Sequence, residues 1–200
     1  MPNWKTHLEI AKRVNNKLKY KDKDLELFMI GNILPDINNG YVVKDISTIY
    51  SHNYTHYKGD DFYTYKNFNK LYDVKSNPLL YGYYIHLYSD FMFNNNYYSN
   101  LDDSIKMLSR DEQRRLKQSD FKVYNNKYIN NKLIISDYDL VVDNSKKIDH
   151  ISITKDDLVK VVNFINDQSI YNNNYKYYDD NKLDLLLEEV VNNIVNNKIL

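Results

Sequence analysis

The sequence predicts an all-α protein, folded as a single-domain helical bundle over residues 1–200. Apolar residues recur at intervals of three and four in most of the chain, which is the spacing of amphipathic helices. A length of 200 residues suits one domain with a substantial core. No internal repeat or interdomain linker interrupts the pattern, so we expect residues 96–200 to complete a bundle that begins in residues 1–95.

Two helices and a long loop are expected first. Asn3 is a suitable N-cap for a helix that extends to about Lys19. We expect a second helix to end at Pro35, because the residue before a proline is disfavoured in the α region. The irregular segment from Ile37 to Gly59 predicts a long loop, and such loops in compact domains are often functional. The apolar residues of the two helices are Leu8, Ile10, Ala11, Val14 and Leu18, then Leu25, Phe28, Ile30 and Ile33.

The next two helices have clear patterns. The first is predicted from Phe62 to Tyr72. The second begins at Pro78, with Ser76 or Asn77 as its N-cap, and its sequence PLLYGYYIHLYSDFMF is apolar on nearly all sides. A helix of this kind is normally central and buried, so we expect it to lie in the middle of the bundle.

Capping boxes open two later helices. The motifs are Ser109-x-x-Glu112 and Thr154-x-x-Asp157, and the second is followed by an apolar helical pattern. The first opens the segment RDEQRRLKQ, which is the best candidate in the chain for a local basic patch. Its charges are mixed in sign, so we interpret it as a solvated helix face.

The last helix is predicted from about Lys182 to Asn197. The segment from Phe121 to Asp149 is ambiguous, because its IIS and LVV triplets fit either short strands or buried pieces of helix.

Charge and cysteine content exclude several classes of protein. The 27 Lys and Arg residues balance 27 Asp and Glu residues, whereas a nucleic-acid-binding domain is normally strongly basic. The absence of cysteine excludes disulfides and thiolate ligands, so any metal must be held by imidazole and carboxylate groups. No signal peptide or membrane-spanning segment is recognisable, and we therefore expect a soluble, cytoplasmic protein.

A histidine and an aspartate share one face of the apolar fourth helix. His86 and Asp90 are four residues apart, which places their Cβ atoms about 5–6 Å from each other. Burying a charged carboxylate without a partner is costly. The two side chains can therefore pair with each other or with tyrosine hydroxyls, or they can bind one metal ion together.

Four more residues extend this pair to a candidate metal site. His7 lies among apolar residues of the first helix, Asp36 follows Pro35, and His52 and His56 lie in the long loop. Each has an ordinary alternative, namely a core histidine, a turn aspartate or an exposed loop histidine. Together the imidazoles and carboxylates form a ligand set suited to zinc, with iron and manganese as alternatives. The remaining histidine, His150, is expected on the surface.

These residues lie in four short motifs whose order is characteristic. They are Thr6-His7 with Ala11, F-x-x-G-N-x-x-P-D from Phe28 to Asp36, Thr55-His56-Tyr57, and G-Y-Y-I-H-x-x-x-D from Gly82 to Asp90. The ordered set, which covers about residues 1–95, resembles the zinc-dependent phospholipase C family and in particular its short bacterial branch without a signal peptide. The resemblance implies an all-α bundle of the phospholipase C and P1 nuclease type.

The resemblance also implies roles for the residues. Asp36, a loop histidine, His86 and Asp90 would surround one zinc ion, and Asp90 would bridge to a second metal held by His7. His56 fits the family's Thr-His-aromatic pattern as the loop ligand, while His52 lies nearer to Asp36 in the sequence.

Two departures from the family pattern reduce the expected number of metal ions to one or two. In the secreted enzymes the amino group and carbonyl of an N-terminal tryptophan bind metal, whereas three residues precede Trp4 here. Those enzymes also build another zinc site from two histidines and a glutamate after the H-x-x-x-D motif. In this chain no histidine occurs between Asp90 and His150.

The expected function is metal-dependent hydrolysis of a phosphoester bond. Bound metal lowers the pKa of a coordinated water towards ~7 and withdraws charge from a phosphoryl oxygen, while Asp36 would bind the ion or act as general base. Tyr54, Tyr57 or Tyr83 are candidates for hydrogen bonds to the ligands. No Lys or Arg is placed clearly enough to name as a phosphate clamp. The substrate would be a phospholipid or a small soluble phosphoester.

Two other functions are consistent with the same residues. An HD-type phosphohydrolase also uses histidine and aspartate ligands, but it needs an adjacent His-Asp dipeptide and the chain contains only the reversed Asp149-His150. A non-catalytic or degenerate protein, whose metal ties helices together or is missing, is the alternative from another class. A closed shell of four protein ligands would favour the structural role, and an open coordination position would favour the enzyme.

Overall fold

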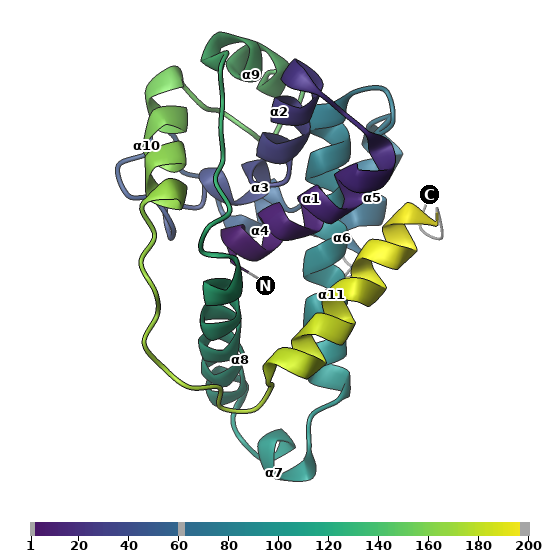
Figure 1. The fold of residues 1–200 in the computed structure, drawn as a ribbon, viewed down its shortest axis with the longest axis vertical. Helices are drawn as coiled ribbons and strands as arrows, with labels where there is room; N and C mark the ends of the chain where they lie inside the picture. The colour runs from purple at the N-terminus through teal and green to yellow at the C-terminus, as the bar shows by residue number, and fades with distance from the viewer. Residues whose placement is uncertain (1–2, 60–62, 197–200) are drawn as a thin grey trace.

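The protein is all-helical. A computed structural model describes residues 3–59 and 63–196, and within these ranges it contains no strand, which confirms the predicted fold class (Figure 1). Phe62 and Asn197, the predicted ends of two helices, lie outside the described residues. The α-helices are α1 (Trp4–Leu18), α2 (Asp22–Gly31), α3 (Leu34–Ile37), α4 (His52–Thr55), α5 (Thr64–Leu71), α6 (Pro78–Ser99), α7 (Asp103–Lys106), α8 (Arg110–Asn125), α9 (Tyr138–Ser145), α10 (Lys155–Asn166) and α11 (Asp180–Val195), and the 3-10 turn η1 (Asn126–Tyr128) follows α8.

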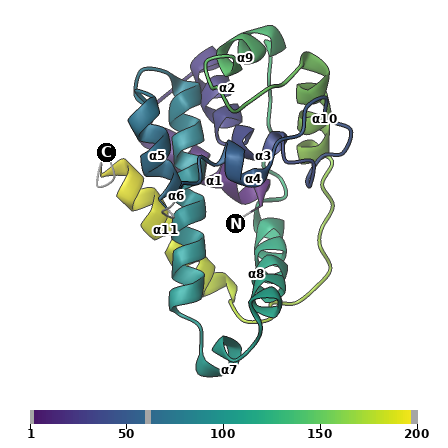
Figure 2. The ribbon, with the colours of Figure 1, turned by 180° about the vertical axis from the view of Figure 1, so that it is seen from behind.

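Helix α6 is the centre of the bundle. Every residue from Leu79 to Asp90 is buried, and α1, α2, α5 and α11 pack against this helix. Figures 1 and 2 show α6 along the long axis of the molecule, with α7 connecting its end to α8. The buried hydrophobic residues that the structure describes, from Trp4 to Ile194, form one core cluster. The predicted central position of the apolar fourth helix is confirmed. The shared core is consistent with a single domain over residues 1–200, which remains a prediction.

Two glycines bring α2 and α6 into close contact. A Cβ atom at Gly82 would lie 2.2 Å from the carbonyl oxygen of Phe28 in α2, and one at Gly31 would lie 2.2 Å from the carbonyl oxygen of Leu79 in α6. Only residues without a side chain allow the two backbones to approach this closely. The contact places His86 of α6 against the end of α2.

The predicted helix starts are confirmed by their capping contacts. Asn77 is the N-cap of α6, and its side chain accepts a hydrogen bond at 2.8 Å from the backbone of the first turn. Ser109 and Glu112 form a complete capping box at α8, and Thr154 and Asp157 form another at α10. Each box satisfies backbone N–H groups that a helix start leaves without an intrahelical partner.

The chain between α2 and α5 is more helical than predicted. Helix α2 ends at Gly31, so Pro35 was wrongly predicted to end it. Pro35 instead lies in the first turn of α3, where the missing N–H of a proline costs nothing. Inside the predicted loop, Ser51 caps α4 by accepting a hydrogen bond from the N–H of Tyr54, and His52 begins that helix. The ambiguous LVV triplet is also helical and belongs to α9.

Side-chain contacts hold the rest of the loop against the C-terminal half of the chain. The amide of Asn38 donates hydrogen bonds to the carbonyl oxygens of Thr48 and Ser152, at 2.8 and 2.7 Å. Asp157 accepts a hydrogen bond of 2.9 Å from the backbone N–H of Ser47. Burial alone would raise the pKa of Asp157, but hydrogen bonds from Ser47 and from the start of α10 hold it below its usual value. These contacts hold the part of the loop that precedes α4.

Candidate metal centre

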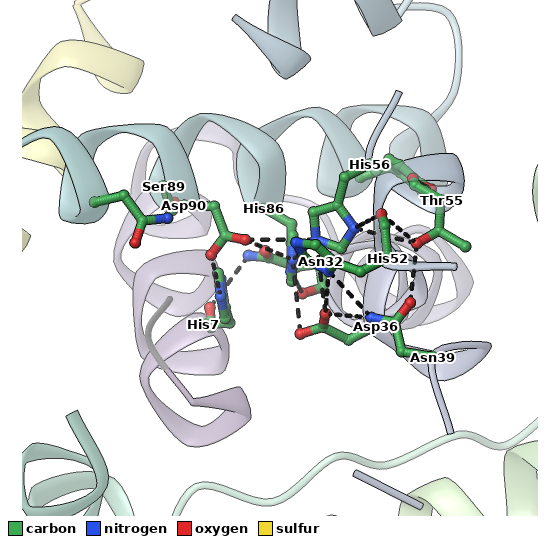
Figure 3. A network of polar contacts seen from close by, with 12 residues as sticks. His7, Asn32, Asp36, Asn39, His52, Thr55, His56, His86, Ser89 and Asp90 are labelled. Atoms are coloured by element: carbon green, nitrogen blue, oxygen red, sulfur yellow. Dashed lines mark hydrogen bonds and ion pairs between the residues drawn. The ribbon is translucent and has the colours of Figure 1, made fainter. Parts of the chain in front are cut away.

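A cluster of imidazole and carboxylate groups lies where α1, α3, α4 and α6 meet. Figure 3 shows these groups pointing toward one another. Five of the side chains are buried, and the sixth, His52, is partly exposed. The structure thus brings together all six residues for which the sequence predicts metal binding, namely His7, Asp36, His52, His56, His86 and Asp90.

The rings of His56 and His86 are oriented by backbone carbonyl groups. His56 Nδ1 lies 3.0 Å from the carbonyl oxygen of His52, and His86 Nδ1 lies 3.0 Å from that of Asn32. Each Nδ1 therefore carries the proton, which leaves the Nε2 atoms of the neutral rings as acceptors. The two Nε2 atoms face each other at 3.3 Å. Two lone pairs at this distance repel each other unless a cation or a proton lies between them, and this ring orientation is typical of histidines that bind metal.

The carboxylates of Asp36 and Asp90 surround these two nitrogens. His56 Nε2 lies 3.6 Å from Asp36 Oδ1 and 3.4 Å from Asp90 Oδ2. His86 Nε2 lies 3.8 Å from Asp36 Oδ2 and 3.6 Å from Asp90 Oδ2. Ligands about 2.0–2.1 Å from a tetrahedral zinc ion are about 3.3–3.4 Å from one another, whereas hydrogen bonds measure about 2.7–3.2 Å. His56 Nε2, His86 Nε2 and Asp90 Oδ2 thus lie 3.3–3.6 Å from one another, a spacing that suits ligands of one ion, while Asp36 presents a different oxygen to each histidine at 3.6 and 3.8 Å.

Asp36 is held from two sides. The indole Nε1 of Trp4 donates a hydrogen bond of 3.2 Å to Asp36 Oδ2, and the amide of Asn39 donates one of 2.9 Å to Oδ1. Each carboxylate oxygen has a second lone pair that remains for a ligand. Trp4 therefore contributes to the cluster through its indole side chain. In the secreted enzymes of the family, by contrast, the expected contribution comes from the backbone amino group and carbonyl of a tryptophan.

His7 forms a second, incomplete group with Asp90. Its ring stacks on the ring of His86 at a centroid distance of 4.0 Å, and its Nε2 lies 3.3 Å from Asp90 Oδ1. This pair lacks the alignment of a hydrogen bond, so neither ring nitrogen of His7 and neither oxygen of Asp90 has a hydrogen-bond partner among the described residues. Buried polar atoms without partners are rare. Their presence here is a second indication that a cation belongs in the cluster.

The electrostatics of the cluster follow from burial and from its mixed charges. Burial, with the neighbouring His86, lowers the pKa of His7 to about 4, so His7 is neutral at pH 7. Burial would also lower the pKa of His86, but the carboxylates of Asp90 and Asp36 raise it above its ordinary value. Burial alone would raise the pKa of Asp90, yet the surrounding imidazoles hold it well below its usual range. Asp90 is therefore ionised, and in the absence of metal it favours a proton on His86.

The two loop histidines, His52 and His56, differ in burial and in their position in the cluster. His56 follows the last residue of α4 and is buried within the cluster. His52 begins α4, and its Nδ1 lies 3.9 Å from Asp36 Oδ1 and 3.4 Å from the amide of Asn39. Burial and the adjacent His56 lower the pKa of His52 to about 4. His52 is thus at the edge of the cluster, close enough to join Asp36 and His56 in one ligand group.

Several supporting residues were not predicted from the sequence. Asn32, Asn39 and Thr55 orient ligand side chains; the Thr55 hydroxyl donates a hydrogen bond of 3.1 Å to Asn39 Oδ1. Of the three tyrosines proposed as supports, Tyr83 donates a hydrogen bond to the carbonyl oxygen of Thr55. A usable signal for Asn39 was its spacing of three residues from Asp36, which puts both on one side of a helical turn.

His150 was expected on the surface, and it is partly exposed. Its ring lies between the rings of Tyr54 and Tyr57, with centroid distances of 3.9 and 4.2 Å. Its Nδ1 lies 2.8 Å from the carbonyl oxygen of Tyr54. His150 therefore packs on the outside of the α4 region and belongs to no ligand group.

A pocket opens beside the cluster. It has a volume of about 890 Å³, and Asp36 and His52 form part of its lining together with Trp4 and Asn39. This volume is in the range of sites for small ligands, about 300–1,000 Å³. A molecule in the pocket would reach the Asp36 side of the cluster, while His7 and His86 are fully buried behind it.

The fold and the cluster define an all-helical protein with buried histidine and aspartate groups able to hold a metal ion. A family model described as zinc dependent phospholipase C matches residues 6–189, and the chain belongs to this family. The match extends well beyond the region of about residues 1–95 in which the motifs were recognised. No curated protein and no solved structure shows significant similarity to the chain. Among the described residues, no helix combines the length and the apolar character that are needed to cross a membrane.

Proposed function

We propose that this protein is a metal-dependent phosphoester hydrolase of the phospholipase C type, with zinc held by Asp36, His56, His86 and Asp90. The observation that carries the proposal is the spacing of four side chains. Five distances between their nitrogen and oxygen atoms, from 3.3 to 3.8 Å, are close to the ligand-to-ligand distance around tetrahedral zinc. The orientation of both imidazoles by backbone carbonyl groups supports the same assignment.

A second ion would lie between His7 and Asp90. Asp90 Oδ2 faces His56 and His86, while Oδ1 faces His7 at 3.3 Å. One carboxylate can therefore bridge two ions. His7, His86 and Asp90 form one possible ligand group. Because the first ion already takes His86, only His7 and Asp90 remain for a second ion, so this second site is incomplete and one or two ions are expected per chain.

The chemistry of the site would divide between the ion and the protein. With an open coordination position, as when Asp36 acts as a base and not as a ligand, zinc would supply a nucleophilic water at neutral pH and positive charge for a phosphoryl oxygen. Asp36 lines the pocket and is fixed by Trp4 and Asn39, so its carboxylate can act as a ligand or accept a proton as general base. His52, neutral at pH 7 and at the pocket edge, is placed to contact the substrate or to join Asp36 as a ligand.

A structural role for the metal is the second candidate. Four protein ligands complete a tetrahedral shell, which is the arrangement of structural zinc sites. The pocket of about 890 Å³ that reaches Asp36 favours the enzyme, because a metal that only ties helices together needs no such access. An HD-type phosphohydrolase is not supported, since the chain matches a different family and lacks the His-Asp dipeptide.

Removal of the metal tests the proposed function. Protein treated with a chelator is expected to lose hydrolysis of a generic phosphodiester and of a soluble short-chain phospholipid, and to regain it when zinc is added. Elemental analysis should give one or two zinc ions per chain. Zinc at a concentration one hundred times its Kd should also raise the free energy of unfolding by about 2.7 kcal/mol.

The melting temperature with and without zinc, compared with the hydrolysis rate, distinguishes the catalytic role of the metal from the structural role. Zinc that raises the melting temperature without restoring any hydrolysis would favour the structural role. Metal-free protein that neither binds zinc nor becomes active with zinc or manganese would contradict the proposed site altogether.

A further inference from the structure

The pocket beside the metal centre has a basic wall, which we define as Arg114, Lys117 and Lys122 of α8. Arg114 and Lys117 are three positions apart and share one face of the helix, while Lys122, five positions further along, lines the same pocket. The carboxylate that lines the same pocket is Asp36, which the proposed function assigns to the metal. Arg114 and Lys117 belong to the RDEQRRLKQ segment, the sequence's best candidate for a basic patch, although its mixed charges favoured a solvated helix face.

Lys117 is the central residue of the basic wall. Its side chain is only 7% exposed, although lysine is almost never buried without a partner. Its Nζ donates hydrogen bonds to Asn94 Oδ1 at 2.7 Å and to the Tyr98 hydroxyl at 3.1 Å. Both acceptors are uncharged, and no ion pair of Lys117 occurs among the described residues. The Nζ also lies 4.4 Å from the centroid of the Tyr98 ring. The ammonium group has three donors, and the two hydrogen bonds leave the third N–H for an anion.

The other two members of the basic wall are exposed. The Arg114 guanidinium is 3.0 Å from Asp111 Oδ1 at the surface, and this exposed pair is weak enough to exchange for a better anion. Lys122 Nζ lies 5.5 Å from the centroid of the Tyr171 ring. Three cations on one wall of a concave site raise the local concentration of anions.

The chemistry of the lining distinguishes between kinds of phosphoester. A quaternary ammonium headgroup is recognised by aromatic faces, which Trp4, Tyr41 and Phe164 supply in the same pocket. The three cations of the basic wall repel such a headgroup. A second phosphate or a carboxylate would instead receive charge-assisted hydrogen bonds from Lys117 and Arg114. We infer that the pocket binds phosphoesters that carry a second anionic group, with Lys117 and the rest of the basic wall holding that group while the first phosphate lies at the metal centre. This inference rests on the proposed function.

A set of four probes tests the substrate class and its source. Two probes carry a second phosphate. Dioctanoyl phosphatidylinositol 4-phosphate is the lipid probe, and its deacylated form, glycerophosphoinositol 4-phosphate, is the free soluble probe. Dioctanoyl phosphatidylcholine and glycerophosphocholine are the matched probes, in which a cationic choline group replaces the phosphorylated inositol. With zinc-loaded protein, we expect kcat/KM to be about ten- to hundred-fold higher for the phosphorylated member of each pair, the range of a hydrogen bond to a charged group. The pair that reacts faster identifies the lipid or the free source.

Variants of α8 test the residues. Lys117→Met keeps a long apolar side chain and removes the charge, and it should reduce the preference for the second phosphate about tenfold, mainly through KM. If Lys117→Met impairs folding, Arg114→Gln at an exposed position tests the same loss of preference for the second phosphate. Arg115→Gln is the matched control, because Arg115 is exposed on the same helix outside the pocket and its loss should leave the preference unchanged.

The inference and the proposed function fail in different ways. Calorimetry measures how tightly the two free probes bind. If glycerophosphoinositol 4-phosphate binds more tightly than glycerophosphocholine, and Lys117→Met removes the difference, the inference is supported even when no probe is hydrolysed. Two outcomes would overturn the inference and leave the proposed hydrolase function intact. In the first, the choline probes are cleaved at the same rate as the phosphorylated probes. In the second, Lys117→Met and Arg114→Gln leave the preference for the phosphorylated probes unchanged. Equal binding of both free probes to an inactive protein would also overturn it.

Discussion

Replacing His86 by alanine is expected to abolish both zinc binding and hydrolysis. Its Nε2 lies within 3.3–3.8 Å of His56, Asp36 and Asp90, and its ring also stacks on His7. The substitution therefore removes a ligand and leaves the ionised Asp90 without one of its three neighbouring imidazoles. Loss of a group that only supports a ligand costs about 10–100-fold in metal affinity or activity, so loss of a ligand should cost at least about 100-fold. Competition with a chromophoric chelator measures the zinc affinity, and a phosphodiester assay measures the rate.

The natural control for this change is His150→Ala. His150 is stacked between two tyrosine rings and lies in none of the ligand groups, so its variant should bind the full amount of zinc. A His86→Ala protein that is folded and binds zinc with wild-type affinity would remove His86 from the site.

Replacing Gly82 by alanine is expected to cause the largest loss of stability. The new Cβ would lie 2.2 Å from the carbonyl oxygen of Phe28 and 2.9 Å from the backbone N of Asn32. These are backbone atoms, so no change of rotamer relieves the contact and α2 must move away from α6. Overpacking costs typically 1–3 kcal/mol, and we expect about 3 kcal/mol here. For a chain of this length, that corresponds to a fall in melting temperature of about 6–12 °C.

The same displacement should weaken zinc binding, because the carbonyl oxygen of Asn32 orients the ring of His86. Gly59→Ala is the matched control. Its Cβ would meet only the amide of Asn67 at 3.2 Å, a side chain that can move. Differential scanning calorimetry of both variants gives the comparison. If Gly82→Ala and Gly59→Ala melt at the same temperature as the wild type, the close packing of α2 on α6 is wrong.

The sequence predicted the long helices well because their signals are local. The Ser109 and Thr154 capping boxes each lie within four residues, and the apolar pattern after Pro78 identified the central helix without any knowledge of its neighbours. Helices α3 and α4 were missed because helices of four residues show no periodicity. Their positions depend on contacts distant in the sequence, such as those of Asn38 with Ser152 and of Ser47 with Asp157.

The candidate site was partly predictable for a similar reason. His86 and Asp90 could be paired because a helix fixes their spacing, and the family motifs added His7, Asp36 and the loop histidines. The order of His52 and His56 around Asp36 could not be deduced, since it depends on α4. The contact of Trp4 with Asp36 and the burial of Lys117 involve residues far apart in the chain, and no local pattern reports them.

The central claim is that Asp36, His56, His86 and Asp90 hold one zinc ion. Crystals of zinc-loaded protein, measured on both sides of the zinc absorption edge, locate the ion directly by its anomalous scattering. We expect a peak about 2.0–2.2 Å from one nitrogen of each histidine and one oxygen of each aspartate, and a second peak between His7 and Asp90 where two ions bind. A zinc peak elsewhere in the molecule, with these four side chains still in contact with one another and without metal, would contradict the assignment.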